Sequence, residues 1–208
     1  MFWAGSATAQ VSGQAGVASD LVYRGLSLSG GKPGAQLSLA YDHTSGGYGG
    51  VALSQADRAI WLAYLGLARR IGQDWSLDAG ITQRYASLRP GRYREFYAGV
   101  ATSRVLARLS YSPDYASTGT RTWYGELAAS APLTDSISLV ARAGYLAGAF
   151  HDPVRRRSDA SAGLLYATDQ VKIELTANAV RAGHNAAPAY VVPLRKAKGV
   201  VLSVARPF

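Results

Sequence analysis

Apolar and polar residues alternate with a period of two along most of this chain. Residues 75–82 (WSLDAGIT) put Trp, Leu, Ala and Ile on one side and polar or small residues on the other, and residues 104–111, 137–145 and 171–178 follow the same pattern. Such alternation is typical of β-strands with one apolar face. It predicts twelve strands of about ten residues, the length that a tilted strand needs to cross a bilayer. They begin near residues 12, 35, 47, 60, 73, 94, 104, 121, 136, 158, 170 and 198.

The predicted connections alternate between short and long. The short ones are His43–Gly47, Arg70–Asp74, Ala101–Ser103, Pro132–Asp135 and Thr168–Gln170. The long ones are Gly25–Gly34, Gln55–Arg58, Ser87–Tyr93, Ser112–Thr120, His151–Arg157 and Arg181–Ala197. This alternation is typical of an outer-membrane barrel, with its short turns in the periplasm. We therefore predict an all-β fold: a single up-and-down antiparallel transmembrane barrel of about twelve strands, with both termini periplasmic.

Aromatic residues gather at the predicted strand ends, on the apolar side. Tyr23, Trp61, Tyr85, Phe96, Tyr111, Trp123 and Tyr145 fall at the outer ends, and Tyr41, Trp75, Tyr166 and Phe208 at the inner ends. Two rings of aromatic residues at headgroup height are expected where a barrel meets the membrane interfaces. A soluble barrel would instead place its apolar side inward. The pattern therefore predicts lipid outside the barrel and polar contacts or water inside it.

Composition narrows the alternatives. The chain has 208 residues, a formal charge of +9 and no cysteine, which excludes disulfides and zinc–thiolate sites. The basic residues are spread among apolar ones, without a basic helix, so we expect no nucleic-acid partner. Ala7 and Ala9 form the small-residue pattern of a signal-peptidase site. We interpret residues 1–9 as the remnant of a secretory signal and residues 10–208 as the barrel domain.

The last segment, Val200–Phe208, has apolar residues at alternate positions and ends in Phe. It resembles the C-terminal signal by which outer-membrane barrels are handed to their assembly machinery. Arg206 stands where an aromatic residue is usual, and Pro207 fits only a strand terminus because it cannot donate to the ladder. The resemblance implies a barrel-assembly partner acting through Phe208.

A second resemblance extends over most of the chain. Residues 17–27 (VASDLVYRGLS) followed by 31–36 (GKPGAQ) resemble the opening strand and first loop of the TorF family of putative porins. Residues 95–99, 111–115 and 123–124 agree in the expected order. The resemblance implies an outer-membrane barrel with pore activity, and it transfers no substrate or catalytic residue.

Eleven charged residues are predicted to face the lumen, the interior of the barrel. They are Asp20, Arg24, Asp78, Arg84, Glu95, Arg104, Arg108, Glu126, Arg142, Lys172 and Glu174. Two interpretations stay open. Walls of opposite sign could face each other across a water-filled pore, or the charges could pair and fill a narrow barrel.

Two long connections carry further hypotheses. Arg155, Arg156 and Arg157 form a basic run expected at the extracellular rim, where it would bind lipopolysaccharide phosphates, draw anionic solutes to the mouth, or simply be solvated. The longest connection, Arg181–Ala197, would either fold inward as a constriction or lie over the rim.

Enzymatic chemistry finds little support in the sequence. A lipid-facing phospholipase site would need Ser and His together on an outward face, yet His43, His151 and His184 all fall in turns or loops. These residues have no metal-ligand spacing either. We therefore expect no catalysis, metal or cofactor. The predicted function is passive diffusion of small hydrophilic solutes across the outer membrane of a Gram-negative cell, with a preference for anions. The alternative is a narrow or plugged barrel that acts through its outer loops.

Overall fold

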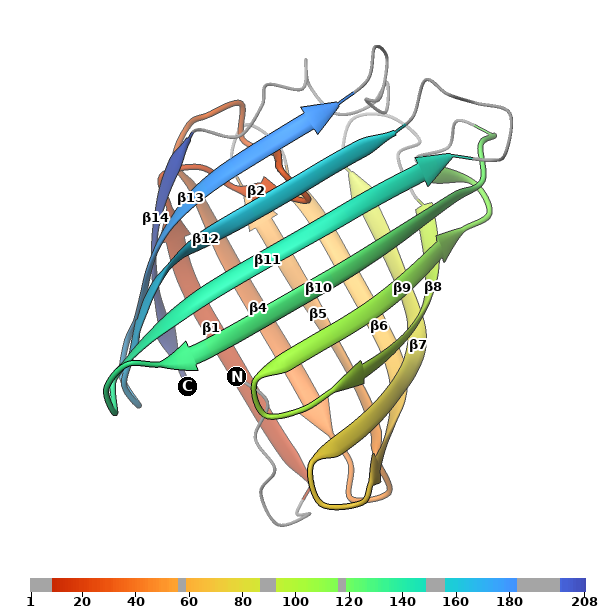
Figure 1. Ribbon diagram of the computed structural model, residues 1–208, viewed down its shortest axis with the longest axis horizontal. Helices are drawn as coiled ribbons and strands as arrows, with labels where there is room; N and C mark the ends of the chain where they lie inside the picture. The colour runs from red at the N-terminus through yellow and green to blue at the C-terminus, as the bar shows by residue number, and fades with distance from the viewer. Residues whose placement is uncertain (1–8, 56–58, 87–92, 116–118, 149–155, 183–198) are drawn as a thin grey trace.

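The computed structural model describes residues 9–55, 59–86, 93–115, 119–148, 156–182 and 199–208. In this part of the chain the twelve expected segments are all strands, including 47–55, and they form one closed antiparallel barrel (Figure 1). The predicted fold class is thus confirmed. The barrel strands are β1 (Gln10–Ala18), β4 (Gly34–Asp42), β5 (Gly47–Gln55), β6 (Ala59–Ile71), β7 (Trp75–Ala86), β8 (Tyr93–Ala101), β9 (Val105–Ser112), β10 (Thr122–Pro132), β11 (Ile137–Gly148), β12 (Arg157–Ala167), β13 (Lys172–Ala182) and β14 (Val200–Pro207).

Each barrel strand pairs with its neighbours in the sequence, and β14 closes the barrel against β1. At this seam Gln14 lies opposite Pro207 and Ala18 opposite Ser203, so five residue pairs join the two strands. The backbones of Gly13 and Phe208 extend the seam with two hydrogen bonds, of 2.8 and 3.0 Å. Pro207 stands at the end of its strand, where a missing N–H is tolerated. No helix in the described residues is long and apolar enough to cross a membrane.

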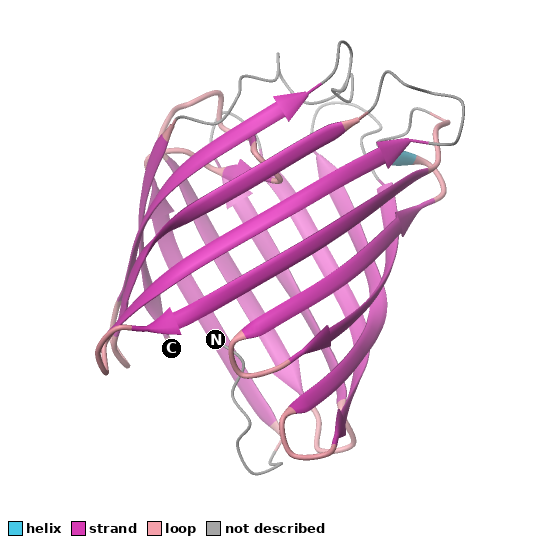
Figure 2. Cartoon of the chain, viewed as in Figure 1, coloured by secondary structure: helices cyan, strands magenta, loops and turns pink. Residues whose placement is uncertain are grey.

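The two ends of the barrel differ in the length of their connections (Figure 2). One end, here the short-turn end, carries the turns 43–46, 72–74, 102–104, 133–136 and 168–171. In three of these turns a threonine hydroxyl, from Thr102, Thr134 or Thr168, accepts the amides two and three residues on. The threonine thereby replaces a backbone partner and closes the turn. Both described chain ends lie at this end, and the other is the long-loop end. Residues 1–8, most of the expected signal remnant, are outside the described residues.

The outer surface of the barrel is apolar. Trp61 pairs with Tyr85, and Phe96, Tyr111 and Trp123 are register partners across β8, β9 and β10. The rings of Tyr111 and Trp123 are 4.7 Å apart, centre to centre. The side chains at these outward positions have few neighbours on the outside; Leu127, for example, is 54% exposed. Tyr23 is the exception to the predicted outer ring, because it lies on a hairpin that turns into the barrel.

Tyrosines on the lumen face lie across glycines of the adjoining strands. A Cβ added at Gly80 would meet the ring of Tyr97 at 2.6 Å, and one added at Gly144 would meet the ring of Tyr124 at 2.5 Å. Glycine is required at these points because any side chain would push the ring away from the wall. The glycines let the hydroxyl of Tyr124 reach Asp159, two strands away, and the hydroxyl of Tyr97 reach Tyr48, three strands away.

Candidate functional site: the charged lumen and its inner hairpin

The connection between β1 and β4 contains a small hairpin, made of β2 (Val22–Tyr23) and β3 (Leu26–Ser27). We call residues 20–29 the inner hairpin. Its two turn residues both have positive φ, 50° at Arg24 and 73° at Gly25, as a two-residue type I′ turn requires. The turn places the Arg24 side chain at the tip.

Short hydrogen bonds hold the base of the inner hairpin. Asp20, 1% exposed, accepts hydrogen bonds from the hydroxyls of Ser27 and Ser29, the second at 2.7 Å. The Ser29 hydroxyl also accepts the amide of Leu21 at 3.0 Å. Asp20 is therefore a structural acceptor at the base of the hairpin, buried from solvent.

The tip of the inner hairpin reaches the far side of the lumen. Arg24 forms an ion pair with Glu95 on β8 through two hydrogen bonds of 2.6 and 3.2 Å, and its guanidinium lies 3.8 Å from the centre of the Tyr124 ring on β10. The neighbouring Gly25 packs so closely on Asp159 and Val180 that an added Cβ would collide with both. Since β8, β10, β12 and β13 are all reached from the β1–β4 connection, the inner hairpin crosses the lumen near the long-loop end.

Tyr23 extends this contact toward β7. Its ring lies 3.6 Å from the Arg84 guanidinium and its hydroxyl donates to Glu95 at 3.4 Å. Burial raises the pKa of the Tyr23 phenol above its usual value, although Arg24 and Arg84 act in the opposite direction. The phenol therefore stays protonated and remains a donor near neutral pH.

A second cluster on the same wall surrounds Arg142 of β11. Its guanidinium binds Asp159 at 2.8 Å and Glu126 at 3.2 Å, and it donates to the Tyr124 hydroxyl at 2.9 Å. Tyr124 in turn donates to Asp159. Arg142 thus forms ion pairs with two carboxylates. Tyr124 connects it to Arg24, whose guanidinium lies over the Tyr124 ring.

A third cluster joins four strands, β5, β7, β8 and β9. The Asp78 carboxylate accepts hydrogen bonds from Arg108 at 2.7 Å and from Tyr48 at 2.8 Å, and the hydroxyls of Tyr48 and Tyr97 are 2.7 Å apart. The guanidinium of Arg108 lies 4.6 Å from the centre of the Tyr97 ring. The acid and the base are paired on one side of the lumen, so their fields largely cancel at a distance.

Of the eleven residues predicted to face the lumen, eight do so from the wall. They are Asp78, Arg84, Glu95, Arg108, Glu126, Arg142, Lys172 and Glu174. Lys172 reaches Gln14 at 3.5 Å. Asp20 and Arg24 belong to the inner hairpin. Both signs occur together along β7 to β12, which is the arrangement that the paired interpretation expects.

Two charged positions differ from the prediction. Arg104 is exposed in the turn 102–104, because β9 begins only at Val105, so it lies at the short-turn rim and not on the wall. Arg157, expected at the rim, is the first residue of β12 and is 1% exposed, because its side chain is on the lumen face. Arg156 is exposed as expected. Arg155 lies outside the described residues, as do His151 and His184.

Four further residues of the lumen clusters are not among the predicted ones: Tyr48, Tyr97, Tyr124 and Asp159. The alternation of faces along a strand would have identified the tyrosines. Tyr97 follows the outward Phe96 and Tyr124 follows the outward Trp123, so both point into the lumen. The sequence pattern does not predict the inner hairpin and instead offers Arg181–Ala197 as the candidate constriction; residues 183–197 of that connection lie outside the described residues.

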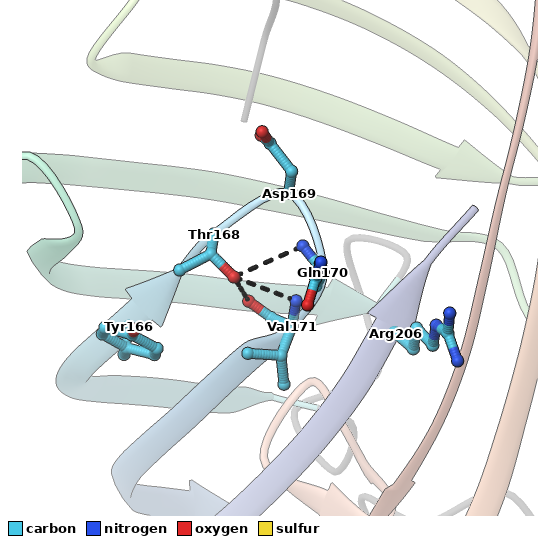
Figure 3. A pocket seen from close by; sticks show the side chains of 6 residues that line it. All are labelled: Tyr166, Thr168, Asp169, Gln170, Val171 and Arg206. Atoms are coloured by element: carbon cyan, nitrogen blue, oxygen red, sulfur yellow. Dashed lines mark hydrogen bonds between the residues drawn. The ribbon is translucent and has the colours of Figure 1, made fainter.

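Other features of the described residues offer less chemistry. They include no group of three or more His, Asp or Glu side chains that could hold a metal ion. His43 bonds only within its own turn, to Ser45 at 2.8 Å. A pocket lies at the turn 168–171, where the Thr168 hydroxyl is engaged in hydrogen bonds within the turn (Figure 3). Its lining residues are Tyr166, Thr168, Asp169, Gln170, Val171 and Arg206.

Comparison with known proteins agrees with the barrel. A family model described as "Bacterial protein of unknown function (Gcw_chp)" matches residues 4–191. This match does not confirm the resemblance to the TorF family. A search of curated proteins finds no match.

Several solved structures are similar in fold. A KdgM porin is 9% identical, with a TM-score of 0.59, over 95% of this chain and 97% of that one. A KdgM porin in complex with disordered oligogalacturonate is 9% identical, with a TM-score of 0.56 and the same coverage. A NanC porin is 10% identical, with a TM-score of 0.58, over 95% of this chain and 98% of that one. At these identities the likeness is one of fold.

Proposed function

The chain belongs to the Gcw_chp family of bacterial proteins, and from this premise we propose that it is an outer-membrane channel for the passive diffusion of small hydrophilic solutes. The observation that carries the proposal is the inverted distribution of side chains. Leucine, valine and aromatic residues cover the outside of a closed barrel, and paired charges and tyrosines occupy the inside. Such a surface is stable only in lipid, and such an interior only beside water or polar partners.

Barrel size supports a channel. Side chains alone fill a barrel of about eight strands, whereas twelve strands enclose a wider lumen. The solved structures of similar fold named as porins support the same assignment. The proposed mechanism is diffusion past the charged wall of β7 to β12, without catalysis, cofactor or energy coupling. We further propose that assembly proceeds through the C-terminal Phe208 and that lipopolysaccharide contacts the long-loop end.

Solute charge is the finer part of the proposal. A preference for anions is favoured by the formal charge of +9 and by the arginines of the lumen, which stay ionised at any accessible pH. The KdgM structure solved with oligogalacturonate adds acidic sugars as candidate solutes. Three of the lumen arginines, Arg24, Arg108 and Arg142, are paired with carboxylates in the described part of the chain, and this limits the preference to a modest one.

The inner hairpin favours a second candidate function. It crosses the lumen and is fastened to the opposite wall by the Arg24–Glu95 pair, so a permanently narrow barrel is the alternative. Such a barrel would act through its outer surface and loops.

Single-channel recording separates the two candidates. Purified, refolded protein is inserted into a planar bilayer under a KCl gradient, together with a variant in which residues 21–28 are replaced by a short Gly-Ser linker. If the protein is a channel, the wild type is expected to show conductance steps, with a reversal potential displaced from zero toward the equilibrium potential of chloride. Steps from the variant alone would establish a plugged barrel. Silence from both folded proteins would overturn the channel proposal.

A further inference from the structure

Arg157 is a buried cation with no partner among the described residues. It is 1% exposed, and none of its three guanidinium nitrogens has a hydrogen-bond partner. A desolvated charge without a partner is costly, by several kcal/mol. Buried polar groups in native proteins nearly always have a hydrogen-bond partner, so an unpaired one calls for an explanation, and a bound solute is one.

The neighbouring carboxylates are already occupied. Asp159, two residues along β12 on the same face, binds Arg142 and Tyr124. Glu126 also binds Arg142, and Glu95 binds Arg24. Beside Arg157 on β11, its register partner is the fully buried Leu146. Among the described residues, no carboxylate therefore pairs with Arg157, and its register partners on the two adjoining strands, Leu146 and Ala182, are apolar residues.

Arg157 lies at the entrance to the constriction. The turn of the inner hairpin packs on Asp159 and Val180, which are register partners. The pair formed by Arg157 and Ala182 lies two steps further toward the long-loop end. Arg157 therefore lies nearer the long-loop end than the contact of the inner hairpin with Asp159 and Val180.

We propose that Arg157 binds the carboxylate of a small monoanionic solute as it enters the barrel. The inference rests on the proposed channel and names the site where its solute is first held. The planar guanidinium matches a carboxylate through two parallel hydrogen bonds. Asp159, about 7 Å away along the strand, repels a dianionic phosphate more than a monoanion. The guanidinium is buried, and in surroundings of low dielectric a hydrogen bond to a carboxylate is stronger than in water.

A thermal-stability titration tests the site without any need for current. The refolded full chain in detergent is melted in sodium gluconate, with sodium acetate as a smaller carboxylate, sorbitol as a neutral polyol, and sodium chloride at equal ionic strength. The matched variants are Arg157→Gln and Arg156→Gln, which lose the same charge at adjacent positions, one buried and one exposed.

Gluconate and acetate, but not sorbitol or chloride, are expected to raise the Tm of the wild type and of Arg156→Gln. In Arg157→Gln the apparent affinity should fall by about tenfold or more, the loss expected for a charge-assisted hydrogen bond. Equal responses of the two variants would overturn the site, since they would indicate charge screening only. A larger shift with sodium phosphate than with gluconate would overturn the assignment of a carboxylate.

A second variant covers the case in which Arg157→Gln fails to fold. Arg157→Met fills similar space without a charge, so without any anion its Tm should equal or exceed that of the wild type, and gluconate should no longer raise it. A large fall in its Tm would overturn the proposal by showing that Arg157 has a structural partner. Channel currents without any gluconate-induced rise in Tm would overturn the Arg157 site but not the proposed channel. A gluconate-induced rise in Tm in a protein without current would overturn the proposed channel but not the site.

Discussion

Arg24 and Glu95 are 71 residues apart in the sequence, yet the guanidinium of one binds both carboxylate oxygens of the other, at 2.6 and 3.2 Å. Both side chains are less than 10% exposed. The pair joins the tip of the inner hairpin to the wall opposite its origin, so the position of the hairpin across the lumen depends on it.

Removing one member of this pair should destabilise the barrel more than removing both. Glu95→Gln leaves Arg24 buried beside a neutral amide, at a cost of about 3 kcal/mol in the free energy of unfolding. The double variant Arg24→Met with Glu95→Met should recover much of that loss, because no unpaired charge remains. Urea titrations in lipid vesicles measure both values. Equal, additive losses would show that the two side chains are not coupled.

Gly144 should tolerate no side chain. In Gly144→Val the new atoms occupy the place of the Tyr124 ring, which must leave Arg142 and Asp159. We expect a loss of about 1–3 kcal/mol in the free energy of unfolding. Gly125→Val is the matched control on the adjoining strand, since a Cβ added there meets nothing within 4 Å. A similar loss in both variants would contradict the proposed contact.

Asp78→Asn should increase selectivity for anions. The substitution neutralises the carboxylate that holds Arg108 and Tyr48, so the positive charge of Arg108 is no longer cancelled. In a bilayer under a KCl gradient, the reversal potential should move further toward that of chloride. Asp135→Asn, at an exposed position in the turn 133–136, is the control and should move it less. A shift toward potassium would refute the role given to this pair.

The two faces of β13 should respond differently to a new charge. Leu175 points outward and Thr176 into the lumen. Leu175→Arg should cost about 2–4 kcal/mol in folding free energy if its position is near the bilayer midplane, whereas Thr176→Arg should cost much less. The fraction folded into lipid vesicles, followed by heat-modified mobility in gels, gives the comparison. Equal folding of both variants would argue against lipid contact at Leu175.

Sequence alone sufficed for the twelve strands, because the period of two is a local property and one apolar face leaves little choice of register. It also placed Asp78 and Arg142 on the lumen face by parity. The sequence does not predict the ion-pair partners of Asp78 and Arg142, since the register across three strands decides which acid meets which base.

The inner hairpin shows the other limit. Tyr23 carries the signal of a membrane aromatic, and only the Arg24–Gly25 turn, with both φ angles positive, reveals that the chain reverses there. Three adjacent arginines suggest a solvated loop, and for this reason the sequence predicts Arg157 at the rim. The start of β12 lies within that run, and strand boundaries are the feature that sequence patterns locate least well.

The seam between β1 and β14 has a mechanical consequence. Five residue pairs join these strands, fewer than join any other two neighbouring barrel strands in the described part of the chain, and no covalent link crosses there. A force that widens the wall sideways meets its weakest resistance at this line. Parting it would expose two unpaired strand edges at once, each able to accept a strand from another chain. The barrel therefore has a built-in direction of lateral opening, between its first strand and its last.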